Sequence, residues 1–124
     1  MTQPVEVYPV GISCPDVTSH IRATVTGAAG NLPTFLSTTA VPTLNGRRPD
    51  MVYIGAEKAN ADEVYITWDG KTTPSATLGF LVPKLPSFLT IPKKGGNGVQ
   101  DADIKVFAGS GTQYLQTKWE WVAS

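Results

Sequence analysis

Residues 63–70 read EVYITWDG, and this stretch decides the fold class. Val64, Ile66 and Trp68 fall on one face of the stretch, and the residues between them fall on the other. Such an alternation, with a period of two, is typical of a β-strand that buries one face. Asp69-Gly70 tolerates the positive φ angles of a tight turn, so a hairpin is expected directly after the strand.

Similar short strands are expected on both sides of this hairpin, because glycines and prolines separate further apolar runs and no helical stripe is longer than about two turns. We predict strands over residues 21–26, 35–40, 51–56, 63–68, 76–82, 88–91, 104–108 and 114–122. This spacing is typical of a sandwich, a jelly roll or a barrel. We therefore predict an all-β fold: a compact β-sandwich or jelly-roll of about eight short antiparallel strands with an extended N-terminal arm.

The inward faces of these strands supply a candidate core. In the last strand, Trp119 and Trp121 share a face with Leu115, which favours burial of both indole rings. A chain of this length hides roughly two-thirds of its unfolded surface, which is enough for one domain. The candidate core consists of Val25, Val64, Ile66, Trp68, Ile104, Val106, Leu115, Trp119 and Trp121.

The first twenty residues differ from the rest, since they contain Pro4, Pro9 and Pro15 and no Lys or Arg. Proline favours extended backbone, so we expect residues 1–20 to form an extended arm or an edge strand, and residues 21–124 to form a single β-sandwich domain. Two interpretations stay open for the arm: a first strand with a loop, or an arm that packs on a neighbouring subunit. In the second interpretation the candidate contacts are Val5, Val7, Tyr8 and Val10.

The charge balance excludes several classes of protein. Ten basic residues balance ten acidic ones, and charged residues make up 16% of the chain, against about 25% in a typical soluble domain. A basic nucleic-acid binder and a charged disordered tail are therefore excluded. A lightly charged surface suits a protein that lies against other protein.

The N-terminal sequence and the cysteine count add expectations about location. The sequence begins without a basic or apolar signal segment, and no apolar run is long enough to span a bilayer. We expect a protein made in the cytoplasm and not individually secreted, with neither a membrane nor a nucleic acid as partner. Cys14 is the single cysteine, so no intrachain disulfide and no cysteine-based metal site are possible.

The polar residues form no recognisable catalytic motif. His20 is the single histidine and has no Ser or Cys partner that the sequence identifies, and Cys14 has no evident base. A glycosidase needs two carboxylates on either side of a sugar, and calcium needs a complete loop of oxygen ligands. The candidate carboxylates lie at predicted turns, where Asp is common for backbone reasons. They are Asp62, Glu63, Asp69, Asp101 and Asp103. We expect no enzyme activity, no cofactor and no metal.

Two groups of side chains suggest binding instead. The first is a basic group that either meets an acidic neighbour or is simply solvated. It forms the second part of the candidate subunit interface: Arg47, Arg48, Lys84, Lys93 and Lys94. The second is the set of tryptophans, Trp68, Trp119 and Trp121, with Tyr53 and Tyr114. Exposed aromatic rings would stack on sugars, whereas buried ones belong to the core.

Three stretches carry a resemblance to a known group of proteins. Residues 64–79 read VYITWDGKTTPSATLG, residues 89–92 read LTIP, and residues 104–112 read IKVFAGSGT. This order of hairpin and strands resembles the small all-β structural proteins of tailed-bacteriophage virions. The resemblance covers residues 62–121 and contains no catalytic residue.

The resemblance implies a capsid decoration, or cement, protein. Such a protein binds the outside of the capsid and bridges neighbouring subunits, so the implied partner is the major capsid protein and the implied location is the capsid surface of the virion. A homo-oligomer, a trimer or dimer, is also implied. Two alternatives stay open: a tail, neck or head-fibre component of the virion, and a carbohydrate-binding β-sandwich module.

Overall fold

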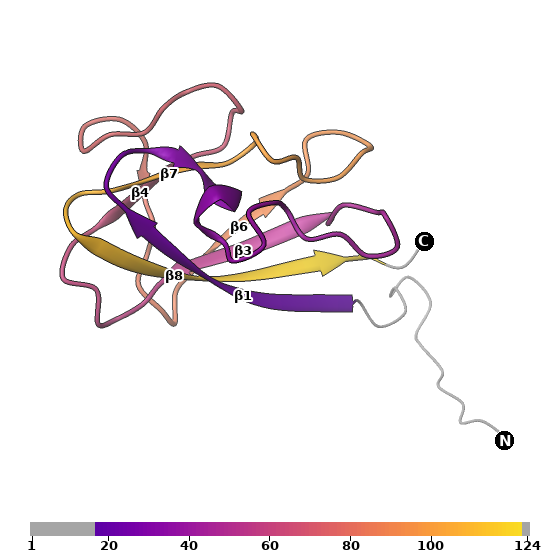
Figure 1. The fold of residues 1–124 in the computed structure, drawn as a ribbon, viewed down its shortest axis with the longest axis horizontal. Coiled ribbons are helices and arrows are strands. Elements are labelled where there is room, and N and C mark those ends of the chain that lie inside the picture. The colour runs from indigo at the N-terminus through magenta and orange to yellow at the C-terminus, as the bar shows by residue number, and fades with distance from the viewer. Residues whose placement is uncertain (1–16, 123–124) are drawn as a thin grey trace, which may run out of the picture.

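The computed structural model describes residues 17–122, which form two antiparallel four-stranded sheets (Figure 1). The predicted all-β sandwich is confirmed. The expectations for Val5, Val7, Tyr8, Val10 and Cys14 lie outside the described residues.

The first sheet holds the two longest strands. Its order is β1-β8-β3-β6. These strands span Val17–Thr26 (β1), Thr112–Trp121 (β8), Met51–Ala56 (β3) and Leu89–Pro92 (β6). The strands β1 and β8 pair along their full length, from Val17 opposite Trp121 to Thr26 opposite Thr112. The first and last strands of the described chain are therefore neighbours, and β1 begins inside the range expected for the arm.

The second sheet is built from shorter strands. Its order is β2-β7-β4-β5. These strands span Gly30–Asn31 (β2), Lys105–Ala108 (β7), Val64–Thr67 (β4) and Phe80–Leu81 (β5). Residues 64–67 of the stretch that decided the fold class become the inner strand β4, which pairs with β7 on one side and with β5 on the other. The tight hairpin expected directly after this strand, at Asp69-Gly70, is wrong, because residues 68–79 separate β4 from β5.

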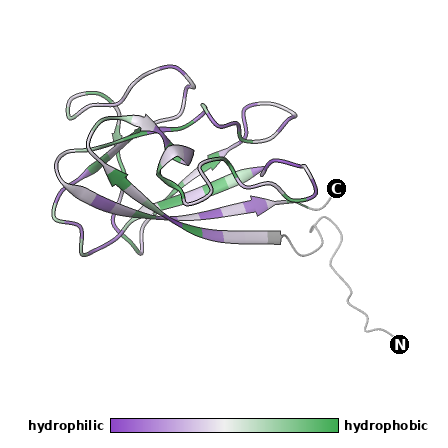
Figure 2. Cartoon of the chain, viewed as in Figure 1, coloured by the Kyte–Doolittle hydropathy of each residue, from purple (hydrophilic) through white to green (hydrophobic). Residues whose placement is uncertain are grey.

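One buried cluster joins the two sheets, so they pack face to face as a sandwich. Val52 and Trp119 of the first sheet belong to the same cluster as Ile66 and Val106 of the second, and each is fully buried. Along β8, buried residues alternate with more exposed ones, and Figure 2 shows hydrophobic and hydrophilic stretches following one another along the strands. All residues of the candidate core are buried in this cluster except Trp68, which is half-buried and packs against its side.

Two predicted strands differ from the structure. The strand expected over residues 35–40 is wrong: the chain forms the 3-10 helix η1 over Leu32–Phe35 instead, with Pro33 in its first turn. Proline suits the start of a helix because its missing N–H has no partner there. Of the strand expected over residues 76–82, Phe80–Leu81 alone is strand, because Ser75 and Leu78 close a tight turn with two backbone hydrogen bonds. Within residues 17–122, no helix has the length and apolar character to cross a membrane.

Candidate functional site

The paired arginines follow a tight turn that fixes where they lie. Leu44 and Arg47 exchange two backbone hydrogen bonds of 2.9 Å each across Asn45-Gly46. Asn45 and Gly46 have φ angles of 52° and 77°, the pattern of a two-residue turn in which both central residues are left-handed. Asn and Gly adopt this backbone with little strain, so the local sequence determines the turn. The turn places Arg47 beside the end of β8.

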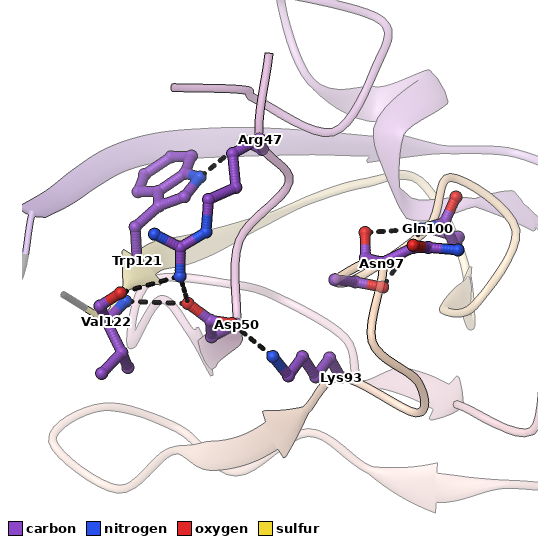
Figure 3. Close-up of polar contacts among 8 residues, drawn as sticks. Arg47, Asp50, Lys93, Asn97, Gln100, Trp121 and Val122 are labelled. Carbon is purple, nitrogen blue, oxygen red and sulfur yellow. Dashed lines mark hydrogen bonds and ion pairs between the residues drawn. The ribbon is translucent and has the colours of Figure 1, made fainter. Parts of the chain in front are cut away.

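Asp50 is the residue around which the site is built. Its side chain is 10% exposed, and Lys93 Nζ lies 2.7 Å from its Oδ1. Arg47 Nη2 and the Val122 backbone N–H donate to its Oδ2, at 2.7 Å and 2.8 Å. Figure 3 shows the carboxylate between the guanidinium and the ammonium groups. Both carboxylate oxygens are therefore already engaged.

These contacts lower the pKa of Asp50 below its ordinary value. The hydrogen bond from Lys93 is the main cause, burial opposes it, and the Val122 N–H and the charge of Arg47 add to the lowering. Sequence reasoning missed Asp50. In the sequence, the one nearby partner that could have pointed to Asp50 is Arg47, three residues earlier. The other two partners, Lys93 and Val122, are distant in sequence and reach Asp50 through the pairing of β6 and β8 with β3.

A tryptophan and a glycine hold the surroundings of Asp50 in place. The Trp121 indole Nε1–H donates to the backbone carbonyl of Arg47 over 2.8 Å. On the other side, Gly98 has a φ of +82°, and a Cβ there would lie 2.7 to 2.8 Å from atoms of Arg48 and Pro49. The glycine-rich loop therefore packs directly on the backbone that carries the arginines.

A surface hollow with a volume of about 480 Å³ opens beside this cluster. We call it the cationic hollow. It is lined by Asn45, Gly46, Arg47, Arg48, Asp50, Lys93, Gly96, Asn97, Gly98 and Gln100. The structure thus brings together three of the five basic residues that the sequence grouped.

The other two basic residues lie elsewhere. Lys94 and Asp103 line an adjacent hollow, and Lys94 Nζ lies 4.0 Å from the Asp103 carboxylate. Lys84 donates to the backbone carbonyl of Asn60 over 2.9 Å and is not among the residues that line the cationic hollow.

The candidate carboxylates hold turns together. Asp69 accepts hydrogen bonds from the backbone N–H groups of Lys71 and Thr72 and from the Thr72 hydroxyl. Asp62 accepts from the Ser110 hydroxyl and from the backbone N–H of Glu63. In both cases these donors lower the pKa of the carboxyl group, with the Thr72 and Ser110 hydroxyls as the largest causes.

The other three carboxylates also have partners within the protein, and Glu63 accepts the Tyr65 hydroxyl at 2.8 Å. Asp101 accepts the Val41 N–H at 3.0 Å and pairs with Arg48 at 3.0 Å; the Val41 N–H is the main cause that lowers its pKa. Asp103 accepts the backbone N–H of Gln100 at 2.8 Å. In the part of the chain that the structure describes, no three His, Cys, Asp or Glu side chains gather where they would hold a metal ion.

The tryptophans are mostly part of the core. Trp119 is fully buried and donates its indole N–H to the Thr117 hydroxyl at 2.9 Å, and Trp121 is 3% exposed. Neither ring can stack on a sugar. Trp68 is half-buried, and the ring of Phe80 covers it at a centroid distance of 5.0 Å. Two of the three tryptophans that the sugar-binding hypothesis requires on the surface are therefore buried.

Large apolar side chains are nevertheless exposed on the surface. Phe80 and Leu81 form the edge strand β5 and are 63% and 48% exposed, and Leu78, at 54%, lies just before this strand. Phe88 is 53% exposed and contacts Tyr53 on the first sheet, at a ring distance of 5.7 Å. Exposed His20, on β1, lines a separate hollow of about 330 Å³ beside these last two rings. The sequence patterns did not mark these apolar residues as exposed.

The comparisons with known proteins assign no family to this chain. No protein-family model matches the chain, and no curated protein matches it. Among solved structures, the chain is similar to a protein of the Bacillus endospore appendages, described as a novel family of disulfide-linked pili. The identity is 11% and the TM-score 0.42, over 97% of this chain and 98% of the other. A likeness of this size assigns neither a function nor a partner.

Proposed function

We propose that this chain is a structural virion protein that binds the outside of a bacteriophage capsid and stabilises it by bridging neighbouring capsid subunits. The observation that carries the proposal is the apolar surface at the β5 edge, where Leu78, Phe80 and Leu81 are exposed. Exposed apolar side chains that gather at one sheet edge are typical of a surface that binds another protein. The resemblance of residues 62–121 to bacteriophage virion proteins supplies the class of partner.

The chemistry of the carboxylates supports a structural role. A glycosidase acid needs a raised pKa so that it carries a proton at neutral pH. Asp62, Asp69 and Asp101 instead have lowered pKa values, because each accepts hydrogen bonds that hold a loop in place. These side chains stabilise the turns of a rigid sandwich, which is what a clamp on a shell requires.

The proposed mechanism is clamping by many weak contacts. The partner is the major capsid protein, and copies of this chain bind as trimers or dimers where neighbouring capsid subunits meet. Each copy contributes a modest apolar contact from its β5 edge. Because the shell presents many equivalent sites and the copies are linked, the combined attachment is far stronger than one contact.

A sedimentation experiment tests the proposal. The purified protein is mixed with empty capsids of the cognate bacteriophage, and the bound fraction is measured after pelleting. We expect saturable binding by the unchanged protein and a loss of about fivefold or more for Phe80→Ser, because one central aromatic contact often dominates an interface. Phe88→Ser, which removes an exposed aromatic ring that packs on Tyr53 of the other sheet, is the matched control and should bind as the unchanged protein does.

Two results would contradict the proposal. If the unchanged protein stays in the supernatant at all concentrations, it does not bind the capsid. If Phe80→Ser binds as well as the unchanged protein, the β5 edge is not the contact. A density map of the complete particle then separates a capsid position from a tail, neck or head-fibre position.

A further inference from the structure

The cationic hollow has more positive than negative charge. Arg47, Arg48 and Lys93 line it, and Asp50 is the one acidic residue among the lining side chains. Asp101 pairs with Arg48 at its margin, at 3.0 Å. An excess of one positive charge therefore remains even when this pair is counted as neutral. An anionic group that enters the hollow meets a net attraction.

The cations also have hydrogen-bond donors to spare. Both hydrogen bonds of Arg47 come from Nη2, to Asp50 and to the Val122 carbonyl at 2.7 Å each. Arg48 uses Nη1 alone, and Lys93 Nζ donates once. In the described part of the chain, Nε and Nη2 of Arg48, which point to the same side of the guanidinium, thus have no protein acceptor. A guanidinium with free neighbouring N–H groups matches the two oxygens of a carboxylate.

The hollow is organised before any ligand arrives. Lys93 is held through its backbone N–H, which donates to the Asp50 carbonyl at 2.9 Å, as well as through its ammonium group. Gln100 fixes the opposite wall by donating to the carbonyls of Asn97 and Gly98, at 2.9 Å and 3.2 Å (Figure 3). Because these groups are already held, a ligand loses less affinity to the ordering of side chains.

The charges around the hollow favour a peptide over a nucleic acid. Asp101 and Asp103 lie beside the basic residues, on Arg48 and Lys94 respectively. A polyanionic backbone that follows the surface would meet these carboxylates, whereas a short acidic segment places its charge in the hollow alone. Nucleic-acid binders also present a broad basic face, and this chain has a net charge of zero.

We propose that the cationic hollow binds carboxylate side chains of an acidic polypeptide segment. The inference rests on the proposed function in one respect: the segment belongs to the capsid subunit that this chain contacts. Arg48 supplies paired N–H donors, and Arg47 and Lys93 supply positive charge beside them. The exposed apolar edge at β5 and the cationic hollow are then two separate contacts, one apolar and one electrostatic.

The binding is tested by NMR titration of the full ¹⁵N-labelled chain with a tetraglutamate peptide. Saturable shifts are expected in the amides of residues 45–48, 50 and 93–100 and in the indole N–H of Trp121, which donates a hydrogen bond to the Arg47 carbonyl. Arg48→Gln and Lys93→Gln should each weaken binding by about fivefold, and added salt should weaken it further. Arg48→Gln leaves the hydrogen bonds of Asp50 intact, so a folded variant is available.

Matched controls complete the test. Tetraglutamine should give no localised shifts, and Lys84→Gln, which removes a cation away from the hollow, should bind tetraglutamate unchanged. Absence of saturable shifts in the unchanged chain overturns the proposal, as does tighter binding to a short double-stranded DNA. If Arg48→Gln binds capsids like the unchanged protein and equally well at high salt, this inference fails while capsid binding stands. If the unchanged protein does not bind capsids but does bind tetraglutamate, the proposed function fails instead.

Discussion

Trp119 shows how much of the stability of this fold depends on one residue. It is fully buried between the sheets, and its indole N–H has a partner in the Thr117 hydroxyl. Trp119→Ala should lower the free energy of unfolding by about 3–5 kcal/mol, because it removes a large apolar side chain and leaves a cavity. Urea denaturation followed by circular dichroism measures the loss.

Trp68 is the natural comparison for this prediction. It is half-buried beneath the ring of Phe80, so Trp68→Ala should cost only about 1–3 kcal/mol. A loss for Trp68→Ala that equals the loss for Trp119→Ala would contradict the difference in burial between the two rings.

Asp50 makes the free energy of unfolding depend on pH. In the unfolded chain the pKa of an aspartate is about 3.9. In the folded chain the contacts with Lys93, Val122 and Arg47 lower the pKa of Asp50. At pH values near and below the pKa of the unfolded chain, the unfolded state binds more protons than the folded state. The stabilisation by Asp50 is therefore complete only at pH values above the pKa of the unfolded chain. It is lost as the pH falls through the lowered pKa of the folded state.

The variant Asp50→Asn isolates this contribution. It should cost about 1–3 kcal/mol at neutral pH, because charged hydrogen bonds are lost, and its unfolding free energy should fall less steeply below about pH 4. Unfolding midpoints measured in urea from neutral to acidic pH provide the comparison. Parallel curves for the two proteins would show that Asp50 is not the group responsible.

At the scale of elements, the glycine-rich loop between β6 and β7 contains glycines of two kinds. Gly98 has a left-handed φ, and a side chain there would collide with the backbone of Arg48 and Pro49. A methyl group added at Gly95 would meet no atom within 4 Å, and open space surrounds Gly96 in the same way. Gly98→Ala should therefore destabilise by roughly 2 kcal/mol or more, whereas Gly95→Ala should be nearly neutral. Thermal unfolding of the two variants tests this, and equal melting temperatures would refute it.

The sequence predicts some elements well because they are decided by local pattern. Strands such as β4 and β8 bury alternate residues, so their apolar period is visible without a structure. The segment over residues 76–82 was less predictable, because the Ser75 and Leu78 turn interrupts an apolar run. The cationic hollow could be predicted only in part: its arginines and lysine stand out, but Asp50 is brought to them by strand pairing across distant parts of the chain.

At the scale of the whole molecule, the N-terminal arm expected from the sequence can be tested directly. Every residue of the described core cluster lies between Ala23 and Trp121. The expected role of residues 2–15 in attachment is tested by deleting them. If these residues contact a neighbouring subunit, the deletion should lower capsid occupancy more than it lowers thermal stability. Differential scanning calorimetry and the capsid sedimentation assay measure the two effects, and full occupancy by the shortened chain would exclude a role for residues 2–15 in attachment.

The pairing of β1 with β8 also determines how the molecule responds to force. Val17 lies opposite Trp121, so the described chain leaves the sandwich from two neighbouring strands at the same end (Figure 1). A pull that separates these two ends acts along the hydrogen bonds between the strands, which run across the strand direction. The bonds then open one pair after another rather than all together. A pull that peels β1 from β8 at this end should therefore open the sandwich at a lower force than a pull that slides the two strands past each other.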